Sequence, residues 1–199
     1  MLDCHMTMSN QISTICRSFR YQLRNIGFIR KYLSKQATEK LVHALISSRL
    51  DFGNALLYNL HQTQLSKLQK LQNAAARIIS LSRKRSHITP TLKSLHWLQV
   101  TDRIVFKILL LVFHTVNGSA LQYNIDIIHK YTPPRTLRSS NSGSLTIPKT
   151  SKLWGDRSFS HAGPALWNTL PPIIRNCTSA DKFKQSLKTY LFNACYSQT

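Results

Sequence analysis

The side chains most able to do chemistry are basic residues in an acid-free part of the chain. Residues 52–101 contain seven lysines and arginines and no aspartate or glutamate. Cations without acidic neighbours bind polyanions, of which nucleic acid is the first candidate. The alternative is a solvated helix face, the usual location of Lys and Arg. The candidate contacts to a phosphate backbone are Lys67, Lys70, Arg77, Arg83, Lys84 and Arg85.

An amphipathic helix is predicted to position the first three of these residues. With about 100° per residue, Lys70 and Arg77 fall opposite its apolar stripe, and Lys67 falls at the edge of the stripe. The helix is predicted to run into a basic loop that Pro90 closes. The stripe consists of apolar residues at helical spacing, which are Leu65, Leu68, Leu71, Ala75, Ile78 and Ile79.

A second acid-free stretch, residues 127–155, holds five further bases. Arg135, Arg138 and the nearby Arg157 are the second group of candidate backbone contacts. Prolines, glycines, serines and threonines are frequent from residue 131 to residue 164, which predicts an extended basic connector. A short β-hairpin is predicted inside it, pairing residues 145–147 with residues 158–160.

The composition describes a folded and strongly basic protein. The chain has 199 residues, 42% of them hydrophobic, and a formal net charge of +20. Such an excess of positive charge opposes compaction by self-repulsion, which a polyanionic partner would relieve. An anionic membrane surface is the other candidate, but aromatic residues should then crowd the basic face. The predicted helix with Lys67 and Lys70 carries none, so we expect no membrane partner.

The acidic residues argue against catalysis by this chain. Metal-assisted phosphoryl transfer needs clustered carboxylates, and no two of the seven acids lie within ten residues of each other. No phosphate-binding glycine loop or hydrolase motif occurs, so we expect no catalytic residues, metal or cofactor. The four cysteines are far apart, without zinc-ligand spacing, which favours a reducing compartment. We expect no signal peptide or membrane span, and an intracellular location in the nucleus or cytoplasm.

The remaining periodicity predicts a mainly α-helical fold in three parts. Residues 1–130 form a helical domain, residues 131–164 the basic connector and residues 165–199 a C-terminal helical segment. One predicted helix, 35–58, has the stripe Leu41, Leu45, Ser48, Phe52 and Leu56. The other predicted helices cover residues 9–31, 91–95, 101–117, 119–129 and 181–194.

Several segments, taken in order, resemble the C-terminal part of a LINE-type, jockey-like non-LTR retrotransposon reverse transcriptase. The similarity covers nearly the whole chain, although none of its motifs has a chemical signature. The segments are LVHALISSRLDFGNALLYNL (41–60), KLQKLQNAAARII (67–79), HITPTLKSLHWLQVTDRIVFKILLLVFHTVNG (87–118), YTPPRTLRSS (131–140) and GDRSFSHAGPALWNTLPPIIRNCTSADKFKQSLKTYLF (155–192).

The resemblance implies a thumb-like region without catalysis of its own. The family's polymerase aspartates stand in an aromatic-Ala-Asp-Asp turn, which these residues do not contain. A thumb contacts the template–primer duplex through its backbone, so the implied partners are RNA, DNA or an RNA–DNA hybrid, bound without sequence preference. A palm domain is a further implied partner. The alternative is a structural or interaction remnant of a decayed mobile element with no selected activity.

Overall fold

The structure is a computed structural model that describes residues 7–132, 143–150 and 153–197, with side chains from residue 155 onward in the last range. With 71% of the chain helical and no sheet among the described residues, the predicted mainly α-helical class is confirmed. The chain divides into two compact units, unit 1 (residues 1–103) and unit 2 (residues 104–197). The predicted boundaries at residues 130 and 164 both fall inside unit 2. Each unit is described by itself.

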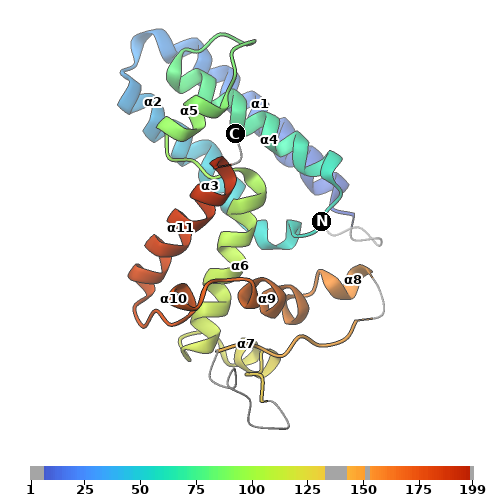
Figure 1. Cartoon of the computed structure of the whole chain (residues 1–199). Coiled ribbons are helices and arrows are strands. Elements are labelled where there is room, and N and C mark those ends of the chain that lie inside the picture. Colours follow the sequence, from blue (N-terminus) through green and yellow to red (C-terminus); the bar gives the residue numbers. More distant parts are fainter. Residues whose placement is uncertain (1–6, 133–142, 151–152, 198–199) are drawn as a thin grey trace. The chain divides into compact units, whose positions relative to one another are not determined.

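Unit 1 is built from helices of very different lengths (Figure 1). A π-helical turn, η2, joins α2 to α3, and two short 3-10 helices, η1 and η3, follow α1 and α3. The helix α6, Val100–Val116, begins at the end of this unit. The other elements are α1 Ser9–Ile29, η1 Arg30–Tyr32, α2 Lys35–Val42, η2 His43–Ser47, α3 Ser48–Asp51, η3 Asn54–Leu57, α4 Gln62–Ser80 and α5 Thr89–Ser94.

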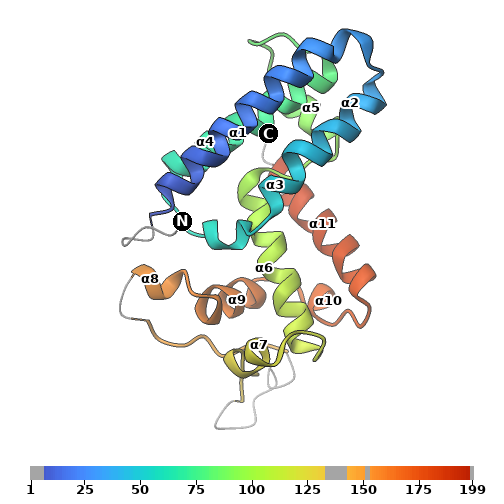
Figure 2. The same cartoon turned by 180° about the vertical axis from the view of Figure 1, so that it is seen from behind.

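The two long helices of unit 1, α1 and α4, lie side by side and run parallel (Figure 2). At their N-terminal ends, the Gln64 amide donates to the Ser9 hydroxyl at 3.1 Å. At their C-terminal ends, the Arg30 guanidinium reaches the carbonyls of Ile78 and Ile79. The helices bury complementary apolar stripes, and the predicted stripe of α4 is confirmed except for Ile78, which is half-buried. The buried residues are Ile12, Cys16, Phe19, Leu23 and Ile26 of α1, and Leu65, Leu68, Leu71, Gln72, Ala75, Ala76 and Ile79 of α4.

Arg30 closes the C-terminal end of α4. Its Nε donates to the Ile78 carbonyl at 2.9 Å and its Nη2 to the Ile79 carbonyl at 3.1 Å. Its Nη1 donates to the Leu33 carbonyl at 2.7 Å. The last carbonyls of a helix have no partner inside the helix, and a cation there also interacts favourably with the helix dipole. Arg30 therefore supplies hydrogen-bond donors to the last carbonyls of α4 from outside that helix, and it holds α1 and α4 in register.

The predicted helix over residues 35–58 is wrong in its end and in its buried face. The helix ends at Asp51, and Phe52 (88% exposed) and Leu56 (60% exposed) of the predicted stripe lie at the surface. Steps of four residues drift around an ordinary α-helix, but the wider π-turn of η2 compensates for this drift and keeps one face inward. The face that is buried consists of Thr38, Val42, Ile46 and Leu50.

Two glutamine side chains of α4 bind the backbone of residues 98–100. The Gln72 amide donates to the Leu98 carbonyl at 2.7 Å, and the Gln69 carbonyl oxygen accepts from the Val100 amide at 2.9 Å. The Arg103 guanidinium binds Asp51 with two nitrogens, Nε at 2.9 Å from Oδ1 and Nη2 on Oδ2. These contacts anchor residues 98–103 to α4 and to the end of α3.

Unit 2 packs around the second part of α6 (Figure 1). The Phe113 and Phe183 rings stack with centroids 4.3 Å apart, and Trp167 lies 5.8 Å from Phe183. A β-carbon at Gly163 would lie 2.8 Å from Cγ2 of Val112, so only glycine permits this approach to α6. The other helices of this unit are α7 Gln122–Ile127, α8 Leu153–Asp156, α9 Phe159–Asn168, α10 Pro172–Arg175 and α11 Ala180–Tyr196.

The hairpin predicted between residues 145–147 and 158–160 is wrong, and so is the extended connector from residue 153 onward, whereas residues 143–150 contain no helix. Residues 153–156 and 159–168 are helical, because packing on α6 outweighs the helix-breaking signals of Gly163 and Pro164. Leu145 forms an isolated antiparallel bridge with Lys130, not with residues 158–160. The Asn168 side chain accepts from the Leu145 amide and donates to its carbonyl, both at 2.9 Å.

Candidate nucleic-acid interface

The predicted basic residues of α4 divide into two kinds. Lys67 and Lys70 are exposed, Lys67 at the edge of the buried stripe and Lys70 on the side away from it. Arg77 is half-buried, and its Nη2 donates to the Ser86 carbonyl at 3.3 Å, which ties the following loop to the helix. Two of the three predicted positions on this helix are thus available to a ligand, while Arg77 has a structural contact.

The basic loop after α4 is an exposed turn. Leu81 ends the helix in the left-handed conformation at φ 55°. The Ser86 amide and hydroxyl both donate to the Arg83 carbonyl, at 3.1 Å and 2.6 Å, which closes the turn. Arg83, Lys84 and Arg85 are all exposed. The loop therefore presents three cations from a backbone that short hydrogen bonds hold in one turn.

Of the second group of predicted contacts, the structure describes only Arg157. Arg157 is half-buried and belongs to unit 2, between α8 and α9. Arg135 and Arg138 lie outside the described residues.

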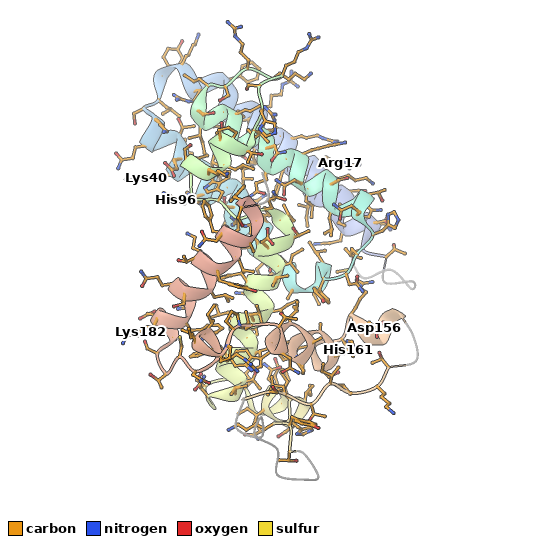
Figure 3. All side chains as sticks on the ribbon, in the orientation of Figure 1. Arg17, Lys40, His96, Asp156, His161 and Lys182 are labelled. Carbon is orange, nitrogen blue, oxygen red and sulfur yellow. The ribbon has the colours of Figure 1, made fainter. Side chains whose placement is uncertain are left out.

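Three arginines of α1, absent from the candidate residues, are exposed on one face of that helix. Arg17, Arg20 and Arg24 follow each other at steps of three and four residues, so they point in similar directions. In Figure 3 the Arg17 side chain extends outward from the paired helices. A signal for this face was present in the sequence, because residues 4–38 contain six bases and no acid.

The cations of the two helices meet at one surface hollow. This hollow has a volume of about 340 Å³ and is lined by Ser13, Cys16, Arg17, Arg20 and Lys67. Arg17 and Arg20 come from α1 and Lys67 from α4, so the parallel packing of the helices creates it. We define the α1–α4 basic face as the exposed cations Arg17, Arg20, Arg24, Lys67 and Lys70.

The Cys16 thiol reports the electrostatics of the hollow. Burial raises its pKa above the ordinary value, because the thiolate is poorly solvated there. The positive charges of Arg20 and Lys67 act in the opposite direction and lower the pKa in part. The hollow is therefore a place where both cations favour a negative charge.

No acid lines this hollow, and five of the acids that the structure describes contact other side chains. Neither α1 nor α4 contains an aspartate or glutamate. In unit 2, Asp156 accepts from the Thr150 hydroxyl and lies 3.9 Å from Nε2 of His161 (Figure 3). Further contacts join Glu39 to His43, Asp51 to Arg103, Asp126 to Gln122 and Asp181 to Lys184.

The chemistry this surface can perform is the binding of anions. Its side chains are cations, which neutralise phosphates but do not polarise a bond for attack as a metal centre does. Among residues 7–132, 143–150 and 153–197, no group of three or more His, Cys, Asp or Glu residues could hold a metal ion. Within the same residues, no helix has both the length and the apolar character needed to cross a membrane.

Comparisons of this chain with family models, with curated proteins and with solved structures found no match.

Proposed function

We propose that the chain binds the phosphate backbone of RNA, DNA or an RNA–DNA hybrid without reading its sequence. The observation that carries this proposal is the α1–α4 basic face, where Arg17, Arg20 and Lys67 converge on one hollow and neither helix holds an acid. The exposed loop 83–85 adds three cations at the end of α4. Cations aimed at phosphates give affinity and position, while sequence is read by contacts to base edges.

The segment resemblance gives this binding a biological setting. We propose that the chain is a thumb-like part of a LINE-type reverse transcriptase, in which a helical surface holds the template–primer backbone. A catalytic role for these residues is not proposed, because the seven acids are well separated in the sequence and polymerase chemistry needs carboxylates that share metal ions.

Salt dependence tests the proposal. Each phosphate that a lysine or arginine neutralises releases condensed cations, so log K falls linearly with log salt. With about four to six phosphate contacts the slope is about −4 to −5, and the Kd at physiological salt is on the order of micromolar or weaker. Fluorescence anisotropy on the full chain, with duplex DNA, duplex RNA and hybrid of equal length and several sequences, measures both. No binding at low salt, or a strong preference for one sequence, would contradict the proposal.

A charge-matched pair of variants shows where the cations act. Replacing Arg83, Lys84 and Arg85 with alanine is expected to flatten the salt slope by about 2 to 3 units. The control replaces three exposed lysines that do not belong to the α1–α4 basic face, Lys40 of α2 and Lys182 and Lys188 of α11. In Figure 3, Lys40 extends from the side of unit 1 away from Arg17. Equal losses in the two variants would mean that bulk charge alone drives binding.

A second candidate function, a structural or interaction role, is favoured by one apolar hollow of unit 1. This hollow of about 200 Å³ is lined by seven residues, and Phe52 among them is 88% exposed. The occupant we propose is the palm domain that the resemblance implies. In the free chain such a surface should promote self-association, so Phe52→Asp should lower the sedimentation coefficient at high protein concentration. Sedimentation that is unaltered by this substitution would contradict the interaction role. The seven residues that line the hollow are Met8, Gln11, Ile15, Phe52, Gly53, Leu56 and Leu57.

A further inference from the structure

The outward face of α1 combines its arginines with exposed aromatic rings. Tyr21 and Phe28 are each 64% exposed. With about 100° per residue, Arg17, Arg20, Tyr21, Arg24 and Phe28 all lie within an arc of about 100° on the helix. The arc begins at Arg20, beside the buried stripe of the same helix, and reaches the side opposite the stripe at Tyr21. Cations and aromatic rings therefore share one continuous strip of surface.

Contacts inside the strip pair the cations with the rings. The Arg24 guanidinium carbon lies 5.7 Å from the centroid of the Phe28 ring. Just after the helix, Nζ of Lys31 lies 4.8 Å from the centroid of the Tyr32 ring, whose side chain is 78% exposed. Both distances are within the range of cation–π attraction, which helps to hold the exposed rings in place. Flat apolar surfaces framed by positive charge are thus displayed to solvent.

This combination matches the requirements of a single strand better than those of a duplex. Unpaired bases expose their flat faces and can stack on aromatic side chains, while a duplex offers mainly phosphates. Stacking does not depend on sequence, because every base has a π-face. The arginines at steps of three and four residues supply the matching contacts to phosphates.

The charge and packing of α1 argue against a membrane surface as the ligand. A helix that lies in a membrane interface inserts its apolar face among the lipids. In α1 that face, which includes Ile12, Phe19 and Ile26, is buried inside unit 1 and is not available. The large apolar side chains that α1 exposes are Tyr21, Phe28 and Ile29, which are too few to form an apolar face.

We propose that the outward face of α1 is a binding site for single-stranded nucleic acid, in which Tyr21 and Phe28 stack bases and Arg17, Arg20 and Arg24 contact phosphates. This inference rests on the proposed function and assigns it a strand type and a stacking surface. Tyr21 and Phe28 lie two helical turns apart, about 10.5 Å along the axis, so the two rings can engage different bases of one strand.

The test compares three ligands with the same number of phosphates per strand: an oligothymidylate, its abasic analogue and a duplex. Anisotropy is measured on the full chain and on the variant Tyr21→Ala/Phe28→Ala. Stacking is worth about 1 to 3 kcal/mol per base, so the variant should lose at least about fivefold in affinity for the oligothymidylate. Affinity for the abasic strand and the duplex should stay the same, and so should the salt slope, because no charge is removed.

A second variant guards against a folding artefact. Tyr21→Leu/Phe28→Leu keeps apolar side chains on the helix but removes the rings, and it should show the same selective loss. Because both residues are largely exposed, circular dichroism should show unchanged helix content for either variant.

The remaining outcomes separate this inference from the proposed function. Equal losses on the oligothymidylate, the abasic strand and the duplex, or no loss at all, would overturn the stacking site while leaving backbone binding intact. Failure of the unaltered chain to bind any of the three at low salt would overturn both. Binding to vesicles of anionic phospholipid that requires Tyr21 and Phe28, with oligothymidylate binding unaffected by their loss, would assign the face to a membrane and overturn the inference.

Discussion

Unit 1 and unit 2 are both helical and both basic, but their interiors are held together differently. In unit 1, polar side chains cross between helices, as Arg30 does to the end of α4 and Arg103 does to Asp51. In unit 2, the aromatic rings of Phe113, Phe183 and Trp167 supply the centre of the packing. The long polar side chains of unit 1 therefore fix the mutual register of helices whose outward faces carry charge.

The same contrast holds for the surface cations. In unit 1, Arg17, Arg20 and Lys67 converge on one hollow from two helices. In unit 2, Arg175 donates to the Ser144 hydroxyl and Lys184 lies 3.6 Å from Asp181. Positive charge is present in both units, but in unit 1 the packing of two helices brings three cations together at one hollow. The net charge of a unit therefore does not by itself locate an anion-binding surface, because the arrangement of the cations also matters.

The largest expected effect separates stability from binding. Phe183 is fully buried and stacks on Phe113, so Phe183→Ala should lower the free energy of unfolding by about 3 to 5 kcal/mol. Urea denaturation followed by circular dichroism measures this loss. The salt slope of nucleic-acid binding should not change at a temperature where the variant is folded, because every cation of the α1–α4 basic face belongs to unit 1. A changed salt slope would contradict the assignment of the binding cations to unit 1 alone.

An intermediate effect is expected at the polar junction of unit 1. Arg30→Ala leaves the carbonyls of Ile78 and Ile79 without their partner, which should cost about 1 to 3 kcal/mol of stability. Arg30→Lys should restore only part of it, because an ammonium cannot reproduce the forked geometry. Lys35→Ala, at an exposed position, is the control and should stay within about 0.5 kcal/mol. An Arg30→Ala chain as stable as this control would contradict the capping role.

The smallest effect concerns the pH response of Cys16. Its pKa is raised in the folded chain, so the unfolded chain releases the thiol proton first as the pH rises. The free energy of unfolding is therefore unaffected by this ionisation below the ordinary thiol pKa of about 8.5, and it declines as the pH rises above that value. Cys16→Ala should reduce this alkaline decline. Thermal unfolding of both chains between neutral and alkaline pH measures the difference, and identical pH profiles would contradict it.

The alkylation rate of the same thiol reports the field of the hollow. Lys67→Met keeps the bulk of the side chain but removes a charge that lowers the pKa of Cys16. The pH midpoint of Cys16 alkylation, followed by peptide mass spectrometry, should therefore rise in this variant. Lys35→Met serves as the control on an exposed residue of another helix. Equal midpoints in the two variants would show that Lys67 does not act on the hollow.

Much of unit 1 could be predicted from local periodicity. The helices α1 and α4 and the exposure of Lys67 and Lys70 follow from apolar residues at helical spacing. The buried face of the helix 35–58 was mispredicted because a π-turn changes the spacing that a sequence pattern assumes. Its end was mispredicted because the chain turns at Gly53, which has a φ of 64°. Helix α9 was missed because Gly163 and Pro164 are breakers in isolation, whereas Gly163 is needed for close packing on α6.

The candidate site was harder to predict because it depends on contacts between distant residues. Arg30 meets Ile78 across 48 positions of sequence, so no local pattern reveals its capping role. The same limit concealed the hollow, since Lys67 joins Arg17 and Arg20 only through the packing of α1 on α4. The acid-free stretch around α1 was nevertheless visible in the sequence, and weighing it equally would have identified the arginines of that helix.

The most direct test of the central claim is the salt slope of the variant Arg17→Ala/Arg20→Ala/Lys67→Ala on a duplex. The charge-matched control is Lys40→Ala/Lys182→Ala/Lys188→Ala. If the α1–α4 basic face holds the backbone, the first variant should flatten the slope by about 2 to 3 units while the control changes it by less than about 1 unit. Equal changes in the two variants would contradict the claim that these two helices form the nucleic-acid interface.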